Sequence, residues 1–113
     1  MESREENGGA VAIRRLVRLR KYEFSIHAEK ERQADRITIT ELEEALGSCE
    51  VIEDYPEDLR GASCLVLGFA GERPIHVVCT LKQSPREVFL ITIYDPSKRP
   101  EKWIDNYRRR AWE

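Results

Sequence analysis

Two histidines and one tyrosine are the side chains of this 113-residue sequence whose types and positions suit acid–base chemistry. His27 is followed by Glu31 and Asp35, at the spacing of one and two helical turns. Residues four apart share one face of a helix, so Glu31 would orient the His27 imidazole. The imidazole could then act as an acid or base near neutral pH. The same spacing is typical of a surface helix with ion pairs, and both interpretations stay open.

His76 and Tyr94 lie in two apolar segments that alternate like strands. Alternation places His76 on the face opposite Ile75 and Val77, and Tyr94 stands at the end of its segment, directly before Asp95. His76 is either a half-buried histidine with its hydrogen bonds satisfied or a group that contacts substrate. Tyr94 either closes the edge of the core or offers its hydroxyl to a phosphate and its ring to a base.

Basic side chains gather in three places along the chain. Arg32 and Arg36 lie four residues apart and form a stripe beside the acidic one, and residues 108–110 form an arginine run. Residues 10–22 combine basic and apolar side chains at helical spacing and contain no acid. Such a helix is either a solvated outer face or a surface for phosphate or for an acidic partner.

Composition excludes several classes of protein. A balance of 19 Lys and Arg against 21 Asp and Glu gives a net charge of -2, so the chain is no uniformly basic nucleic-acid coat. No apolar run approaches the roughly 20 residues of a membrane span, and the N-terminus has no signal-peptide core, so we expect a cytoplasmic protein.

Cys49, Cys64 and Cys79 form no C-x-x-C pair, so we expect reduced thiols, with Cys49 the most exposed, and no metal site. Glycine-rich phosphate loops are missing from the sequence as well, and we expect no cofactor.

The periodicity predicts helices first and strands afterwards. Residues 1–9 are polar and are expected to form a disordered tail, and residues 10–113 a single domain. Helices are expected over residues 10–22 and 26–35, the second with Ser25 as its N-cap. A third helix is expected to begin at Thr40, where Glu43 completes a capping box, and to end at Gly47.

Four apolar segments with period-two alternation predict strands at residues 51–55, 64–70, 75–80 and 88–94. The connections are of hairpin length, so we expect a four-stranded antiparallel meander under the N-terminal helices, a two-layer α+β fold. Alternation predicts six residues on the helix-covered face: Leu65, Leu67, Ile75, Val77, Ile91 and Ile93.

Several short motifs carry a resemblance to a known family. They are Ser25-Ile26-His27-Ala28, Pro74-Ile75-His76-Val77-Val78, and Ile91-Thr92-Ile93-Tyr94-Asp95-Pro96 with Lys102-Trp103 after it. From residue 22 to residue 110 the chain resembles the family of small bacterial proteins catalogued as domain of unknown function 4258. That family is similar to the RelE and MqsR toxins, which implies a RelE-like arrangement of helices on a curved antiparallel sheet.

The resemblance implies a toxin of a toxin–antitoxin pair that cleaves RNA, including mRNA on the ribosome, without a metal ion. Its implied partner is a cognate antitoxin, commonly one with a zinc finger. RNA carries its own nucleophile in the 2′-hydroxyl, so such an enzyme must move protons and stabilise a phosphate. The candidate catalytic residues are His27, His76, Tyr94 and Glu31, the last as the group that orients His27. The candidate RNA-binding residues are Arg32, Arg36, Arg108 and Arg109.

A second hypothesis is a non-catalytic module of the same fold, which binds protein or RNA through its basic helix and basic tail. The acidic net charge and the acidic stripe of Glu31 and Asp35 favour this module. The positions of the two histidines and of Tyr94 favour the enzyme. Cleavage of labelled RNA in excess chelator separates the two hypotheses.

Overall fold

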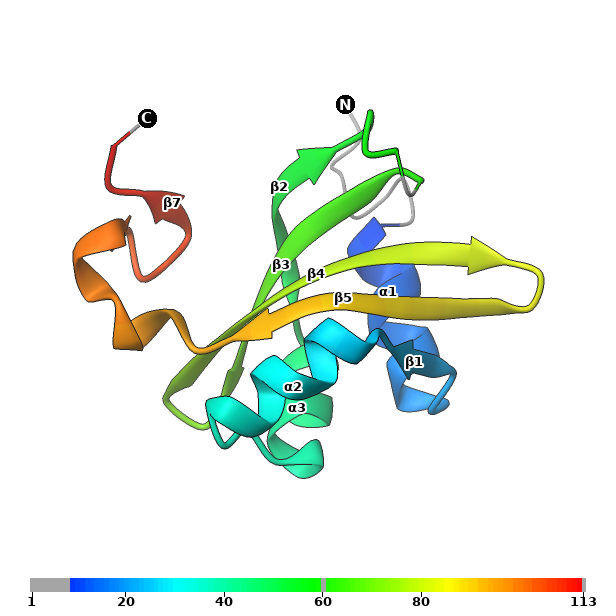
Figure 1. Cartoon of the computed structure of the whole chain (residues 1–113), viewed down its shortest axis with the longest axis horizontal. Coiled ribbons are helices and arrows are strands. Elements are labelled where there is room, and N and C mark those ends of the chain that lie inside the picture. The colour runs from blue at the N-terminus through cyan, green and yellow to red at the C-terminus, as the bar shows by residue number, and fades with distance from the viewer. Residues whose placement is uncertain (1–8, 60, 113) are drawn as a thin grey trace.

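The computed structural model describes residues 9–59 and 61–112. Three helices and a short strand come first: α1 (Gly9–Arg18), β1 (Tyr22–Phe24), α2 (Ile26–Ala34) and α3 (Ile39–Leu46). Four longer strands follow: β2 (Glu50–Tyr55), β3 (Ser63–Ala70), β4 (Arg73–Gln83) and β5 (Arg86–Tyr94). The chain ends in two short 3-10 helices, Pro96–Lys98 and Pro100–Lys102, and a small hairpin of β6 (Trp103–Ile104) and β7 (Arg109–Arg110) (Figure 1). The predicted tail lies outside the described residues, apart from Gly9, which opens α1.

The second and third helices begin where side chains accept hydrogen bonds from the free amides of the first turn. Ser25 caps α2 as predicted, with its Oγ 2.9 Å from an amide nitrogen of that turn. The capping box of α3 consists of Thr38 and Glu41, so the predicted start at Thr40 with Glu43 is wrong. Both pairs fit the T-x-x-E pattern, so the sequence alone does not decide between them, and Leu42, Ala45 and Leu46 of α3 lie in the core.

The sheet has five strands in the order β1-β5-β4-β3-β2, and the four predicted strands pair antiparallel in chain order. The predicted four-stranded antiparallel sheet is nevertheless wrong, because β1 joins β5 as a fifth, parallel strand. The first helix ends at Arg18 rather than at residue 22, since Tyr22 already pairs with Val88. A three-residue strand is too short to display a period of two. The fold is therefore α+β with a mixed sheet.

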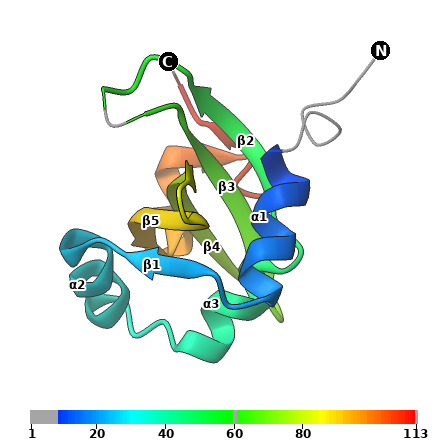
Figure 2. The same ribbon diagram turned by 90° about the vertical axis from the view of Figure 1, so that its right-hand side faces the viewer.

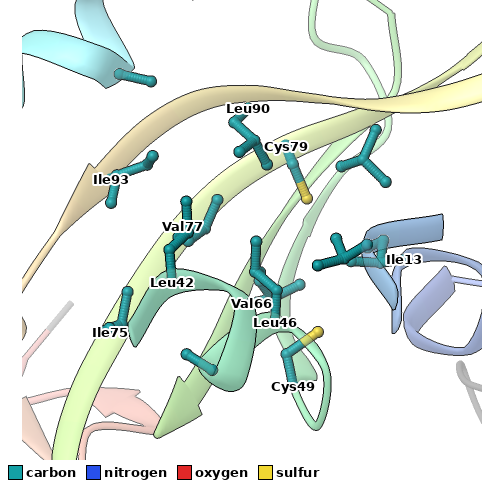
Figure 3. Close-up of a cluster of buried hydrophobic side chains, with 14 of the residues drawn as sticks. Ile13, Leu42, Leu46, Cys49, Val66, Ile75, Val77, Cys79, Leu90 and Ile93 are labelled. Carbon is teal, nitrogen blue, oxygen red and sulfur yellow. The ribbon is translucent and has the colours of Figure 1, made fainter. Parts of the chain in front are cut away.

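The helices cover one face of the sheet, and the main core lies between the two layers (Figure 2). Ile75, Val77 and Ile93 belong to this core, as predicted. Figure 3 shows them with the strand residues Val66, Cys79 and Leu90 and the helix residues Ile13, Leu42 and Leu46.

The other three residues predicted for the helix-covered face lie elsewhere, and the prediction is wrong for them. Leu65 and Leu67 pair with Val78 and His76 across β3 and β4, and directly paired residues point to the same side of a sheet. Both leucines are therefore buried on the second face. The ladder between β4 and β5 shifts its register at Ile91, which is the extra residue of a β-bulge.

The second face of the sheet is covered at one end by residues 96–112, which we call the C-terminal segment (Figure 1). Trp103 of this segment is buried against the sheet. Ion pairs from Arg108 to Glu50 at 3.0 Å and from Arg110 to Glu53 at 2.8 Å attach the segment to β2. The two layers of the fold thus gain a third layer at this end.

The three cysteines are free thiols that lie close to the core. Cys49 is buried, so the prediction that it is the most exposed is wrong, because the turn after α3 leads it under the sheet. Cys64 is half-buried and lies directly opposite Cys79 in the register of β3 and β4, with both thiols free. A hydrogen bond with Cys64, together with burial, raises the pKa of the Cys79 thiol above its usual range.

Gly68 marks the closest approach of β3 to α3, where an added Cβ atom would overlap the backbone of Ala45. We expect Gly68→Ala to lower the free energy of unfolding by about 3 kcal/mol, as in an overpacked core. Gly47→Ala is the matched control, because Gly47 has φ -67° and a Cβ there would lie 3.1 Å from a carbonyl oxygen of its own helix. We expect that control to change the free energy by less than about 1 kcal/mol. Urea unfolding measures both variants, and equal losses would contradict the close packing of β3 on α3.

Candidate functional site

The acidic stripe of α2 binds the backbone of β5 rather than facing solvent. Beyond Leu90 the outer edge of β5 has no strand partner, because β1 pairs with Val88, Phe89 and Leu90 alone. Glu31 Oε1 accepts a hydrogen bond from the Ile93 amide at 3.0 Å, and Asp35 Oδ2 accepts one from the Asp95 amide at 2.8 Å. The two carboxylates therefore take the place of a neighbouring strand, which satisfies this edge of the sheet.

His27 lies on the same stripe, one turn before Glu31. Its Nε2 atom lies 3.1 Å from Glu31 Oε2, so one carboxylate contacts both the imidazole and the amide of β5. The imidazole is 67% exposed and stands on the outside of α2. The structure thus places Glu31 where the sequence put it, as the group that holds His27.

His76 lies on the second face of the sheet, as alternation predicts, but it is completely buried under the C-terminal segment. Its Nε2 atom lies 2.9 Å from the Tyr107 carbonyl oxygen, which accepts hydrogen bonds and cannot donate them. The proton of the neutral ring is therefore on Nε2, and Nδ1 is the acceptor. The Tyr94 hydroxyl, 3.0 Å from Nδ1, donates to it. The His76 and Trp103 rings pack nearly perpendicular to each other, with the ring centroids 4.4 Å apart.

Burial controls the protonation of this pair. It lowers the pKa of His76 to about 4, although the Tyr107 carbonyl and the charge of Glu53 act in the opposite direction. Burial also raises the pKa of Tyr94 to about 12. At neutral pH the imidazole is uncharged and the phenol keeps its proton.

Tyr94 also lines a cleft of about 470 Å³, which we call the basic cleft. It lies where β5 meets the C-terminal segment and the end of α2, and Asp35 and Asp95 form part of its wall. Ion pairs occupy both carboxylates, Asp35 with Lys98 at 3.3 Å and Asp95 with Arg73 at 2.8 Å. The cationic side chains that line it are Lys98, Arg99, Lys102 and Arg110.

The structure therefore joins His76 and Tyr94 and separates them from His27. His27 and Asp35, which lies at the wall of the basic cleft, are eight residues apart, about 12 Å along the helix axis at about 1.5 Å per residue. His76 is buried behind Tyr94, and its link to the cleft is the hydrogen bond that it accepts from the Tyr94 hydroxyl. A substrate in the cleft would meet Tyr94 first.

The predicted RNA-binding arginines lie outside the basic cleft. Arg32 binds Glu29 and the Ile37 carbonyl oxygen, the latter at 2.7 Å, and so fastens the end of α2. Arg36 follows α2 in a left-handed conformation, with φ 56°, and is exposed. The two arginines predicted in the C-terminal run, Arg108 and Arg109, pair with Glu50 and Asp105.

Sequence reasoning missed Lys98, Arg99 and Lys102 as candidate site residues. Their signal was the group of basic residues that begins four residues after Tyr94, where Lys98 and Arg99 are followed by Lys102. Arg110 was part of the predicted arginine run, and it reaches the cleft because β7 pairs with β6. Its guanidinium donates two hydrogen bonds to Glu53 and lies 5.1 Å from the centre of the Trp103 ring.

Comparison with known proteins gives a family. The family model described as "Domain of unknown function (DUF4258)" matches residues 24–95, more than half of the chain. The chain therefore belongs to this family. No curated protein and no solved structure matches it. The matched residues contain His27, His76 and Tyr94 and end where the C-terminal segment begins.

None of the helices in the described part of the chain has the length and apolar character needed to cross a membrane. Those same residues also contain no group of three or more His, Cys, Asp or Glu side chains placed to hold a metal ion.

The buried imidazole should make stability depend on pH. The pKa of His76 is about 4 in the folded chain and near the ordinary 6.5 when unfolded, so the unfolded chain binds more protons between these values. The stabilisation from neutral His76 is complete above pH about 6.5 and falls by about 3 kcal/mol as the pH approaches 4. Unfolding measured from pH 4 to 7.5 should show this contribution in the wild type and in His27→Gln, whereas in His76→Gln the total loss of stability should be smaller by about 3 kcal/mol, because only the carboxylates then titrate.

Carbon-13 NMR of the His76 ring tests the same claim without a substitution. The resonances should report the neutral form with its proton on Nε2 down to pH about 5. A ring that titrates near the ordinary pKa of 6.5 would contradict the burial of His76.

Proposed function

We propose that this chain binds single-stranded RNA in the basic cleft and cleaves it without a metal ion, as a toxin-type endoribonuclease. The observation that carries the proposal is the double position of Tyr94. Its hydroxyl is hydrogen-bonded to a neutral imidazole, and the residue lines a cleft that four cationic side chains share. An acid–base group and a phosphate-binding surface therefore meet at one place.

The cations of the basic cleft suit the RNA backbone. Arg99 and Lys102 are exposed, and no carboxylate within residues 9–59 and 61–112 forms an ion pair with them. A phosphodiester that reaches Tyr94 would lie within the field of these charges, which also stabilise the extra negative charge of the transition state.

The chemical step uses the RNA 2′-hydroxyl as the nucleophile. The Tyr94 oxygen accepts the proton of this hydroxyl while its own proton passes to Nδ1 of His76. The 2′ oxygen then bonds to phosphorus, the bond to the 5′ oxygen breaks, and that oxygen takes a proton from solvent. The products are a 2′,3′-cyclic phosphate and a free 5′-hydroxyl, and His76 later releases its proton. The Tyr107 carbonyl and the charge of Glu53 favour the imidazolium that forms in between.

A specific observation favours a second candidate, a non-catalytic RNA- or protein-binding module. Complete burial lowers the pKa of His76 to about 4, so the imidazole is a weak base at neutral pH. Binding in the basic cleft needs no base. This candidate keeps the same surface for RNA and removes the chemical step.

The proposed biological setting is the one that the sequence resemblance implies. On this proposal the chain is the toxin of a pair in the bacterial cytoplasm and acts on mRNA, including mRNA on the ribosome. Its partner is a cognate antitoxin, for which a zinc-finger protein is the proposed class. An antitoxin that fills the basic cleft would prevent RNA from binding.

Replacement of Tyr94 by phenylalanine separates the two candidates. We expect Tyr94→Phe to slow RNA cleavage about a hundredfold, the size of one acid–base contribution, with RNA affinity nearly unchanged. Tyr22→Phe is the matched control, because the Tyr22 hydroxyl binds Glu43 among the helices. The Arg99→Ala, Lys102→Ala double variant should weaken RNA binding about tenfold. Gel analysis of end-labelled RNA in excess chelator, with and without ribosomes, gives the rates, and filter binding gives the affinities.

Three outcomes decide the matter. Cleavage that depends on Tyr94 supports the enzyme. RNA binding through Arg99 and Lys102 without any cleavage supports the binding module. If the wild type neither cleaves nor binds RNA, both RNA functions are wrong.

A further inference from the structure

The outer side of α1 carries a groove that the proposed function does not use. Val11, Arg15 and Leu19 follow one another at intervals of four residues and so form one stripe of the helix and its last turn. Val11 is 51% exposed and Leu19 54%, whereas the opposite stripe of α1 is buried on the sheet. The groove has a volume of about 390 Å³, and Ala12 and Leu16 complete its apolar floor.

Positive charge surrounds this floor. Arg15, Lys21 and Arg86 line the groove, and α1 carries no acidic residue. None of the three cations forms an ion pair with a carboxylate within residues 9–59 and 61–112. Arg86 donates one hydrogen bond, to Gln83, at 3.1 Å. The groove thus combines an apolar centre with a cationic rim that has no counter-charge in the described chain.

We propose that this groove is a docking site for an acidic amphipathic helix of a partner protein. Val11 and Leu19 are eight residues apart, about 12 Å along the helix axis, which is two turns of any helix laid along α1. Apolar side chains of the partner, repeated at that spacing, would fill the floor between them. Carboxylates on the flanks of the same helix would meet the three cations.

The two features together select this class of partner over RNA and over a lipid surface. RNA would need the cations but would leave the apolar side chains without a contact. A flat lipid surface would contact Val11 and Leu19 but would not enter a concave groove. The site is independent of the proposed function, since α1 packs on the helix-covered face and the C-terminal segment on the other (Figure 1).

A synthetic peptide tests the proposal directly. The probe is a fluorescein-labelled helix of about five turns with leucine at two-turn spacing and glutamate on both flanks, and its control has lysine in place of each glutamate. Fluorescence anisotropy with the full chain should show saturable binding of the acidic peptide and at least tenfold weaker binding of the basic one. The affinity should fall as salt rises, because exposed charges are screened.

Variants locate the binding. We expect Arg15→Glu with Lys21→Glu, and separately Leu19→Asp, to weaken the acidic peptide about tenfold or more. Lys30→Glu, an exposed cation on α2, is the matched control and should leave the affinity unchanged. Circular dichroism shows that each variant is folded.

Several results would overturn the proposal. They are equal affinity for the acidic and basic peptides, no binding of the acidic peptide up to about 1 mM, and binding that the groove variants do not alter. Binding of duplex RNA or of anionic vesicles through Arg15 and Lys21, with no binding of the peptide, would assign the groove to another class of ligand.

Discussion

Two carboxylates on α2 determine how the helical layer meets the sheet. The outer edge of β5 beyond Leu90 presents backbone amides that no strand pairs with, and Glu31 and Asp35 accept hydrogen bonds from Ile93 and Asp95. An unsatisfied amide at a partly buried edge costs about 1–3 kcal/mol, so these contacts fix α2 along β5. The same contacts place the end of α2 at the wall of the basic cleft. The acidic stripe of Glu31 and Asp35 has the sequence pattern of a solvated helix face, but in the structure it joins the helical layer to the sheet. We call this contact the joint between α2 and β5.

Several carboxylates lie where α2 meets β5, and cationic side chains from other elements form ion pairs with them. Arg73 at the start of β4 donates to Asp95 at 2.8 Å, to Glu41 at 3.0 Å and to the Asp35 carbonyl oxygen at 2.6 Å. One guanidinium thus ties together the end of α2, the start of α3 and the end of β5. Lys98 binds the Asp35 carboxylate from the C-terminal segment. Arg99 and Lys102 line the same cleft and form no ion pair with a carboxylate of residues 9–59 and 61–112.

Local sequence signals predicted most of the fold, since capping residues and alternation depend on neighbours in the chain. Ser25 and the four long strands are examples. The start of α3 was wrong because two T-x-x-E pairs overlap there, and the other failures occur where a contact distant in sequence decides the structure. The parallel strand β1 forms because the edge of β5 is free to pair with it, and Leu65 and Leu67 lie on the second face because β3 pairs them with Val78 and His76 of β4. His76 contacts the Tyr107 carbonyl oxygen, and Tyr107 follows Asp105 and Asn106 in a left-handed turn. No pattern of apolar residues in the sequence predicts this turn.

For the candidate site, sequence reasoning selected His76, Tyr94 and the contact between His27 and Glu31. It could not tell which histidine meets Tyr94, because that depends on strand register.

Hydrogen exchange at a single backbone amide tests the joint between α2 and β5 most directly. In Glu31→Ala we predict that the Ile93 amide exchanges about tenfold faster or more, because it loses the acceptor that closes its edge of the sheet. Amides of the β3–β4 ladder should exchange as in the wild type, and so should the Ile93 amide in Lys30→Ala, which changes an exposed side chain on the same helix. Unchanged exchange of the Ile93 amide in Glu31→Ala would contradict the account, because the carboxylate would then not hold the edge of β5.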